Sequence, residues 1–235
     1  MASSWESVNV DNKDMPLYVS VPASGGPVPG IVVVHGRSGL EDFIKDTTHM
    51  LAQLGYAAVA PNLYHRDGPD CKDDNEVRKA RLRDPSIIRD IAGAIGFLKN
   101  HQQVDGGKLG IVGFCMGGRL VYLMSAASKD LKAGVMFYGS GTMMPFGEGR
   151  SPFERTSEVS CPIQGHFGAN DQNPSPADMR KLDAELTKFG KAHEFHSYAG
   201  AAHAFVNTGS NNYRPHAAAQ SWPKAMEFFS RHLVG

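Results

Sequence analysis

The chain has 235 residues, 41% of them hydrophobic and 20% charged, so it can bury a core without the help of disulfides or metals. Lys plus Arg and Asp plus Glu number 24 each, which argues against a broad basic surface for nucleic acid or an anionic membrane. We therefore expect a small-molecule partner. We also expect a monomer, with a homodimer as the alternative.

The cysteines are Cys71, Cys115 and Cys161, an odd number without a CxxC pair. This pattern is typical of free thiols in a reducing compartment and not of a disulfide framework. The first residues, MASSWESVNVDNKDMPLYV, lack the basic start and apolar run of a signal peptide. No apolar run approaches the ~20 residues of a membrane span. A cytoplasmic protein is predicted, unless a leader precedes this start.

Apolar bursts alternate with amphipathic stretches along the chain. A hairpin is predicted from 4–10 and 17–24, because both segments have the pattern of short strands. In chain order the elements that follow are a strand at 30–36, a helix at 41–54, a strand at 56–64, a helix at 85–100, a strand at 108–114, a helix at 116–128, strands at 133–139 and 162–168, a helix at 174–190, a half-exposed strand at 193–198 and a helix at 216–233.

Strands that alternate with helices predict an α/β fold, with a mostly parallel sheet covered on both faces. We expect one domain over residues 1–235. Ligands in such sheets bind at the carboxyl ends of the strands. The segment 64–84, YHRDGPDCKDDNEVRKARLRD, is polar and too long for an ordinary connection. It is predicted to be irregular, either a lid or a mobile excursion.

The stretch GIVGFCMGG, residues 110–118, places Cys115 between Gly113 and Gly117 at the end of an apolar run. A nucleophile elbow needs this spacing, because the nucleophile takes a positive φ and side chains two residues away would collide with neighbouring backbone. The following helix N-terminus favours a thiolate. The alternative is a glycine-rich turn with an inert buried cysteine.

Two later loops supply partners for this cysteine. In α/β-hydrolases the chain order is nucleophile, acid, histidine. GANDQNPSP carries Asp171 after one predicted strand, and GAAHAF carries His203 after the next. Asn170 and Asp178 are weaker rivals for the acid, and Asp171 has an alternative interpretation as a helix-capping residue. We predict a catalytic triad of Cys115, His203 and Asp171.

The loop after the strand at 30–36 reads HGRSG, an HGxxG form in which a backbone N–H completes an oxyanion hole. By position we assign that N–H to Arg37, paired with the N–H of Met116. His35 and Ser38 are expected to orient the loop. The Arg37 side chain could also place positive charge near the elbow, and we then expect a reactive Cys115 and a pocket that tolerates anionic or electron-poor acyl groups. The alternative is a surface ion pair with Glu41 or Asp42.

Together, GFCMGGRL, GANDQNPSP and GAAHAF resemble the dienelactone hydrolase family, and the resemblance covers nearly the whole chain. Its specific part is the cysteine elbow, since most α/β-hydrolases use serine. The resemblance implies an eight-stranded α/β-hydrolase fold, the triad of Cys115, His203 and Asp171, and Tyr138 near the site.

Two features depart from the family pattern. Family members carry a glutamate just after the strand that ends at Val34, where this chain has Gly36. Family members also bind the substrate carboxylate with two arginines. One of these places holds Val206 and Asn207 here. For the other, Arg78 and Arg81 are candidates. The resemblance thus leaves open whether the substrate carries a carboxylate.

No cofactor or metal is expected. His193, His196 and His203 lie close in sequence, but the first two point to opposite faces of a strand, and no paired Cys/His spacing appears. We interpret the chain as a cysteine hydrolase of small esters or lactones that forms a thioester acyl-enzyme. The alternatives are acyl transfer, C–C or dehalogenating hydrolysis on the same fold, or a non-catalytic ligand-binding or thiol-sensing module.

Overall fold

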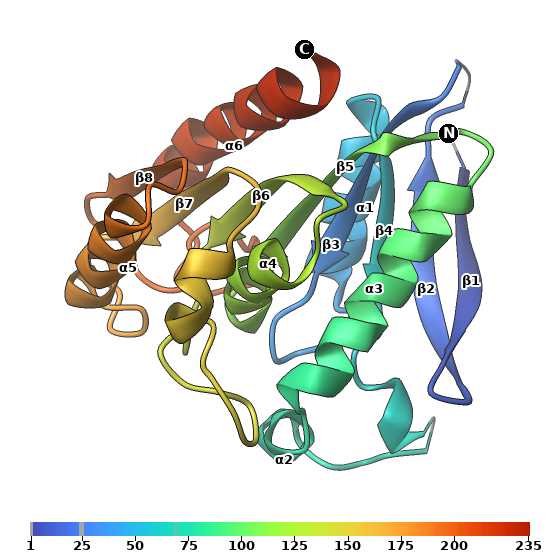
Figure 1. Ribbon diagram of the computed structural model, residues 1–235, viewed down its shortest axis with the longest axis horizontal. Helices are drawn as coiled ribbons and strands as arrows, with labels where there is room; N and C mark the ends of the chain where they lie inside the picture. Colours follow the sequence, from blue (N-terminus) through green and yellow to red (C-terminus); the bar gives the residue numbers. More distant parts are fainter. Residues whose placement is uncertain (1, 24–25, 69) are drawn as a thin grey trace.

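The computed structural model of the protein describes residues 2–23, 26–68 and 70–235. The described strands form an eight-stranded sheet in the order β1-β2-β4-β3-β5-β6-β7-β8 (Figure 1). The strands are β1 (Ala2–Val10), β2 (Lys13–Val21), β3 (Val28–Val34), β4 (Ala57–Pro61), β5 (Val104–Phe114), β6 (Leu131–Phe137), β7 (Ile163–Gly168) and β8 (His193–Tyr198). The helices are α1 (Asp42–Gln53), α2 (Asn75–Ala80), α3 (Asp84–Asn100), α4 (Met116–Ala127), α5 (Pro176–Lys188) and α6 (Pro215–Phe229).

The predicted core strands and helices are confirmed, with ends displaced by a few residues. The initial hairpin is also present, although residue 24 of its predicted second strand lies outside the described residues. The segment 64–84 was predicted to be irregular, but part of it is regular. It contains a 3₁₀ turn at His65–Asp67 and helix α2, which begins because the Asp74 side chain accepts hydrogen bonds from two backbone N–H groups of the first turn. Residue 69 of that segment is not described.

Strand β3 lies at the centre of the sheet and fixes the place of the site. Its neighbours are β4 on one side and β5 on the other, and both pairs are parallel. After β3 the chain forms β4 on one side of it and then crosses to form β5 on the other side. The carboxyl ends of two such strands leave a crevice between their loops, which is where open α/β sheets bind ligands.

Two helical layers cover the sheet. Val32 and Val34 of β3 point into a core shared with α3, α4 and α5. Ile31 and Val33 point to the opposite face, into a core shared with α1 and α6. Figure 1 shows α3, α4 and α5 in front of the sheet. Because a central strand is buried on both faces, each of these side chains stabilises the fold by about 1.5–3 kcal/mol.

Helix α4 is buried along most of its length, from Met116 to Ser125. It packs against β5 and β6 and leaves little room for the turn before it to move. In the part of the chain that the structure describes, no helix combines the length and apolar character that a membrane crossing requires.

Candidate active site

Cys115 stands on the sharp turn between β5 and α4, with φ 57° and ψ −120°. Only glycine fits at the positions two residues before and after Cys115, because any side chain there would overlap neighbouring backbone. A Cβ on Gly113 would lie 2.2 Å from the carbonyl oxygen of Gly117, and a Cβ on Gly117 would lie 2.1 Å from the carbonyl oxygen of Val34. The structure thus has the elbow geometry that the sequence predicted, and the strained backbone exposes the Cys115 side chain at the end of β5.

Asp171 and His203 come from the loops after β7 and β8. His203 Nδ1 donates a hydrogen bond of 2.9 Å to Asp171 Oδ2. The other carboxylate oxygen accepts the backbone N–H of Asn173 at 2.9 Å, and Asp171 is 2% exposed. A fully buried carboxylate with both oxygens bonded holds the imidazole in one orientation and one tautomer, so Nε2 is the ring nitrogen available to Cys115.

The Cys115 thiol is half-buried and close to two polar partners. Its Sγ lies 3.7 Å from Ser140 Oγ, the contact with hydrogen-bond geometry in this conformation, and His203 acts on it from the other loop. Burial raises the pKa of this thiol. The hydrogen bond and charge of His203, together with Ser140 and the Met116 N–H, outweigh burial and lower the pKa below its usual value.

His203 responds in the opposite sense. Burial lowers its pKa, but bonds to Asp171 and Cys115, and the negative charges of both, raise that pKa to about 9. The raised pKa of the imidazole and the lowered pKa of the thiol both favour an imidazolium–thiolate pair. The two groups titrate as a coupled pair, since each charge stabilises the other.

The loop after β3 approaches the elbow from the other side of the crevice. The Gly36 carbonyl accepts hydrogen bonds from His35 Nδ1 at 2.6 Å and from Gly39 N–H at 3.2 Å. His35 Nε2 accepts the Leu63 N–H at 3.1 Å, so the ring is neutral and donates from Nδ1. Burial, the largest influence, lowers the His35 pKa to about 4 and keeps it neutral. His35 therefore orients the loop, as the sequence predicted.

Position 36 faces the nucleophile. A Cβ on Gly36 would lie 3.9 Å from Cys115 Sγ and 3.3 Å from its Cβ. A carboxylate at this place, which the resemblance implied for family members, would contact the thiol. In this chain glycine leaves that contact empty, and Ser140 is the polar neighbour instead.

A cavity of about 280 Å³ opens above the thiol. Its lining comes from the loop after β3, the start of α1, the elbow, and the loops after β6 and β8: Gly36, Arg37, Ser38, Glu41, Phe43, Ile44, Phe114, Cys115, Tyr138, His203, Ala204, Asn207, Gly209 and Ser210. The predicted residues Cys115, His203, Arg37, Tyr138 and Asn207 thus meet around one space. Asp171 lies behind His203, outside the lining.

Tyr138 is the buried wall of this cavity. It is 1% exposed, and its ring packs edge to face against His203 with centroids 5.0 Å apart. Its hydroxyl has no hydrogen-bond partner among the described residues. Burial, with further contributions from nearby negative charge, raises the Tyr138 pKa well above its usual value, so the hydroxyl keeps its proton. A buried donor without a partner is costly, which makes this hydroxyl available to a ligand.

The side chains of the three arginines named from the sequence all bind carboxylates. The Arg37 side chain pairs with Glu76 of α2, and not with Glu41 or Asp42. Arg78 binds Asp67 through its Nε at 3.0 Å and stacks on Tyr64, while Arg81 binds Asp67 and Asp73. Neither Arg78 nor Arg81 is among the cavity-lining residues. Both are held by acidic side chains of the segment before α2.

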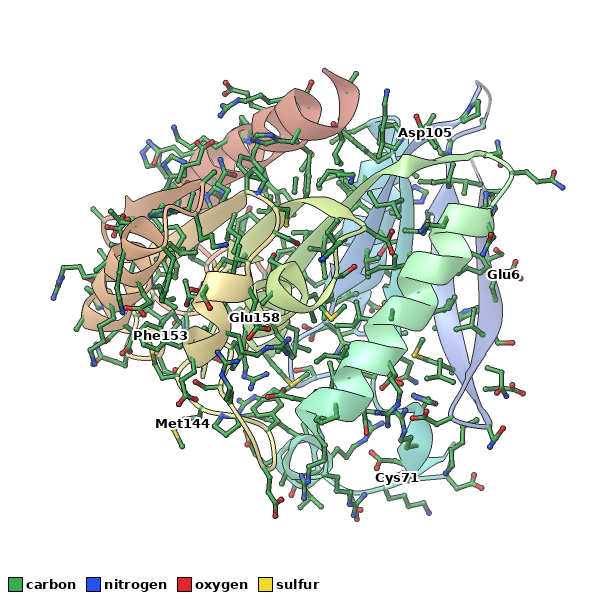
Figure 2. All side chains as sticks on the ribbon, viewed as in Figure 1. Glu6, Cys71, Asp105, Met144, Phe153 and Glu158 are labelled. Atoms are coloured by element: carbon green, nitrogen blue, oxygen red, sulfur yellow. The ribbon has the colours of Figure 1, made fainter. Side chains whose placement is uncertain are left out.

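Sequence reasoning missed two residues of the site. Ser140 follows β6 in the motif FYGSG, next to the strand that carries the elbow, and this adjacency was the available signal. The loop continues to Met144, which is exposed at its outer end (Figure 2). Glu41 was considered only as a partner of Arg37, yet its carboxylate lines the cavity and accepts a hydrogen bond of 3.2 Å from Asn207 Nδ2.

Over the described ranges of the chain, no group of three or more His, Cys, Asp and Glu side chains is arranged to hold a metal ion. The arrangement places a thiol with a lowered pKa and an imidazole with a raised pKa at one cavity, with a buried carboxylate bonded to the imidazole behind it.

Known proteins resemble this chain over most of its length. The model of the dienelactone hydrolase family matches residues 15–233. A relative from Methylorubrum extorquens, named "Putative carboxymethylenebutenolidase", is 32% identical over 94% of this chain and 78% of its own length. A Bradyrhizobium protein, named "Probable 2-oxo-3-(5-oxofuran-2-ylidene)propanoate lactonase", is 28% identical over 100% of this chain and 96% of its own length.

A solved structure gives the same result at the level of the fold. The crystal structure named "Putative Dienelactone Hydrolase" from Klebsiella pneumoniae superposes with a TM-score of 0.89 at 27% identity, and it covers 98% of each chain. The expected fold and family resemblance are thereby confirmed.

Proposed function

Since the chain belongs to the dienelactone hydrolase family, and is thus a hydrolase, we propose that it cleaves small esters or lactones with Cys115 as the nucleophile. The observation that carries the proposal is the placement of this cysteine. Cys115 occupies a strained elbow beside a histidine whose other nitrogen is bonded to a buried aspartate. An inert structural cysteine needs neither the strain nor the partners.

The reaction begins with the imidazolium–thiolate pair. The Cys115 thiolate attacks the carbonyl carbon, and the carbonyl electron pair moves to the oxygen. The N–H groups of Met116 and Arg37 stabilise that oxyanion. Met116 opens α4, whose first N–H groups have no partner within the helix. His35 fixes the Gly36 carbonyl through a hydrogen bond. In a trans peptide the N–H of the next residue, Arg37, points opposite to that carbonyl, so it is free to bind the oxyanion.

The tetrahedral intermediate collapses to a thioester on Cys115, and the C–O bond to the leaving group breaks. His203 gives its Nε2 proton to the departing alkoxide or enolate. Neutral His203 then removes a proton from water, which attacks the thioester and releases the carboxylic acid and the Cys115 thiolate. In a lactone the leaving oxygen stays attached to the acyl chain, so one open-chain product forms. Asp171 keeps the imidazole in the tautomer that both proton transfers need.

A reducing compartment suits this chemistry, because Cys71, Cys115 and Cys161 are all free. A cytoplasmic location and a monomeric state are the corresponding proposals.

The test is the capture of the acyl-enzyme. The protein is mixed with p-nitrophenyl acetate or with members of a lactone panel, quenched in acid, and analysed by peptide mass spectrometry. We expect acetylation of Cys115 and release of nitrophenolate. Cys71→Ala is the matched control, since Cys71 lies before α2 (Figure 2) and is not among the cavity-lining residues, so it should leave both results unchanged. Acylation of another residue, with Cys115 unmodified, would refute the proposal.

A further inference from the structure

The charges around the cavity are arranged against a negatively charged ligand. Apart from Cys115 and His203, the charged side chains that line the described cavity are Arg37 and Glu41. The Arg37 guanidinium is 58% exposed and already pairs with Glu76, so its charge is matched outside the cavity. Glu41 has no ion-pair partner among the described residues. Its negative carboxylate is therefore the unbalanced charge closest to a ligand that binds above the thiol.

Glu41 is turned into the cavity by its local structure. It is the N-cap residue of α1, where an acidic side chain ordinarily accepts the free N–H groups of the first turn. Glu41 makes no such cap. Its Oε1 instead accepts a hydrogen bond from Asn207 Nδ2, which arrives from the loop after β8. Among the described residues this is the hydrogen bond the carboxylate receives, so Oε2 is left for a ligand.

The surrounding walls add no cation. Arg78 and Arg81, the candidates for binding a substrate carboxylate, are bound to Asp67 and lie outside the lining. Asn207 occupies one place where family members were expected to carry an arginine, and its amide is engaged by Glu41. The Tyr138 hydroxyl, without a partner, offers one neutral donor. Because His203 is paired with the Cys115 thiolate and Arg37 with Glu76, no unpaired cation among the described lining residues would offset the repulsion between Glu41 and a ligand carboxylate.

We propose that Glu41 determines the substrate class: its carboxylate makes this cavity favour cationic and uncharged esters or lactones over carboxylated ones. The proposal rests on the proposed ester or lactone hydrolysis. It replaces the expectation from the sequence that the pocket beside Arg37 would tolerate anionic or electron-poor acyl groups. The expected size is about tenfold per unit of substrate charge, because a unit charge about 6 Å away at a half-exposed site contributes on that order.

The first experiment compares three nitrophenyl esters of similar size: 4-(trimethylammonio)butyrate, 5,5-dimethylhexanoate and the adipate monoester, which are positive, neutral and negative. Values of kcat/KM are measured at about pH 8, where carboxyl groups are ionised. For the wild type we expect the order positive, neutral, negative. Glu41→Gln keeps the shape and the Asn207 contact. It should raise kcat/KM for the negative ester about tenfold, lower it for the positive ester and leave the neutral ester within about twofold.

Asp42→Asn is the matched control. It removes the same charge from the adjacent residue, which is 92% exposed and does not line the cavity. Screening by solvent should limit its effect on any of the three esters to less than about twofold. An equal change in both variants would mean that the general field of the surface, and not Glu41, sets the preference, and would overturn the proposal.

A second experiment does not depend on turnover. Cys115 is alkylated with iodoacetate, which is negative, or with iodoacetamide, which is neutral, and the two rates are read from the Cys115 peptide. Glu41→Gln should raise the ratio of iodoacetate to iodoacetamide labelling about tenfold, with Asp42→Asn unchanged. A ratio within twofold of wild type would overturn the proposal. A shifted ratio in a protein that hydrolyses neither these esters nor the lactone panel would refute the proposed function and leave the role of Glu41 standing.

Discussion

Cys115 and Arg37 both follow central strands and both line the cavity, yet they are held in different ways. The backbone of Cys115 is fixed from several sides: its N–H donates to Phe137 O, and its carbonyl accepts the N–H groups of Arg119 and Ser140. The Arg37 side chain is exposed and is held by one ion pair with Glu76.

We call the part of the cavity at Cys115 its floor and the part at Arg37 and Glu41 its rim. Buried backbone contacts hold the floor, whereas the rim consists of charged side chains that water reaches. Buried contacts specify one geometry, because any displacement leaves polar groups unpaired or atoms overlapping. Rim charges are weakly held and screened, so they can select a ligand but cannot set the positions of the reacting atoms. Changes to the floor should therefore have larger effects than changes to the rim.

The largest effect is expected for Cys115→Ala. Loss of the nucleophile should lower kcat/KM for a neutral ester by about 10³-fold or more, as removal of a triad member does. The fold should persist, because alanine is smaller and the backbone contacts remain. Ester hydrolysis and thermal unfolding measure the two results, with Cys71→Ala as control. Wild-type turnover in Cys115→Ala would show that another group attacks the substrate.

The next largest effect is expected where the floor is supported. Arg119 of α4 is fully buried and binds Asp84 through two hydrogen bonds of 2.7 Å. Its Nε donates to Gly141 O at 3.1 Å, in the loop that carries Ser140. Arg119→Met leaves Asp84 as an uncompensated buried charge. The free energy of unfolding should fall by about 3–5 kcal/mol.

Urea denaturation measures this loss. The double variant Arg119→Met/Asp84→Met should recover much of the stability, because it removes both charges together. A single variant that unfolds within about 1 kcal/mol of wild type would mean that the buried pair does not support the floor, since that is the range of surface pairs.

The elbow itself tolerates no added atoms. Gly117→Ala would place a Cβ 2.1 Å from Val34 O, so α4 or β3 must shift. We expect a loss of stability of about 1–3 kcal/mol and a loss of activity. Gly96→Ala on α3 is the matched control, since no atom lies within 4 Å of its added Cβ. It should stabilise the protein by about 0.5–1 kcal/mol. Equal effects of the two variants would contradict the packing argument.

The pH profile of kcat/KM should be bell-shaped. Activity falls at low pH as the thiolate is protonated, and the lowered pKa of Cys115 places this limb below the usual range of a thiol. Activity falls again as pH rises through about 9, where His203 loses its proton. Each limb changes activity about tenfold per pH unit.

Asp171→Asn tests this assignment. The Asp171 carboxylate raises the pKa of His203, so its removal should move the alkaline limb to lower pH. A lower maximal rate is also expected, because the tautomer is no longer fixed. An alkaline limb that stays in place would show that another group controls it.

The difference between floor and rim also decides what the sequence could predict. The strand and helix pattern and the elbow follow from hydrophobic periodicity and from glycine spacing, which act locally along the chain, and the confirmed fold depends on this local information. Asp171 and His203 were predicted from the order nucleophile, acid, histidine of α/β-hydrolases, applied to the loops after two predicted strands.

The rim depends on contacts between distant segments. Arg37 meets Glu76 across 39 positions, and Glu41 meets Asn207 across 166. No periodicity encodes such pairs, so Glu41 was missed, and Arg37 pairs with Glu76 instead of Glu41 or Asp42, the partners of the alternative interpretation. Helix α2 was missed for a related reason. Six residues are too few to show an amphipathic period, and its start is set by one capping aspartate. That residues 1–235 form one domain stays a prediction.

The smallest effect is expected for Arg37→Gln, which tests the interpretation that this arginine brings positive charge near the elbow. If the guanidinium stabilised the thiolate, its removal would raise the apparent pKa of Cys115. In the structure the pKa of this thiol is set by burial, His203, Ser140 and the Met116 N–H, and the Arg37 charge is matched by Glu76. The pH dependence of iodoacetamide labelling should therefore shift by less than about 0.3 units, the equivalent of a twofold effect.

Glu76→Gln sharpens the test, because it frees Arg37 without removing its charge. A freed guanidinium that reaches the cavity would lower the labelling midpoint, while one that stays in solvent would not. A rise of a full unit in Arg37→Gln would show that the rim, and not only the floor, sets the reactivity of Cys115.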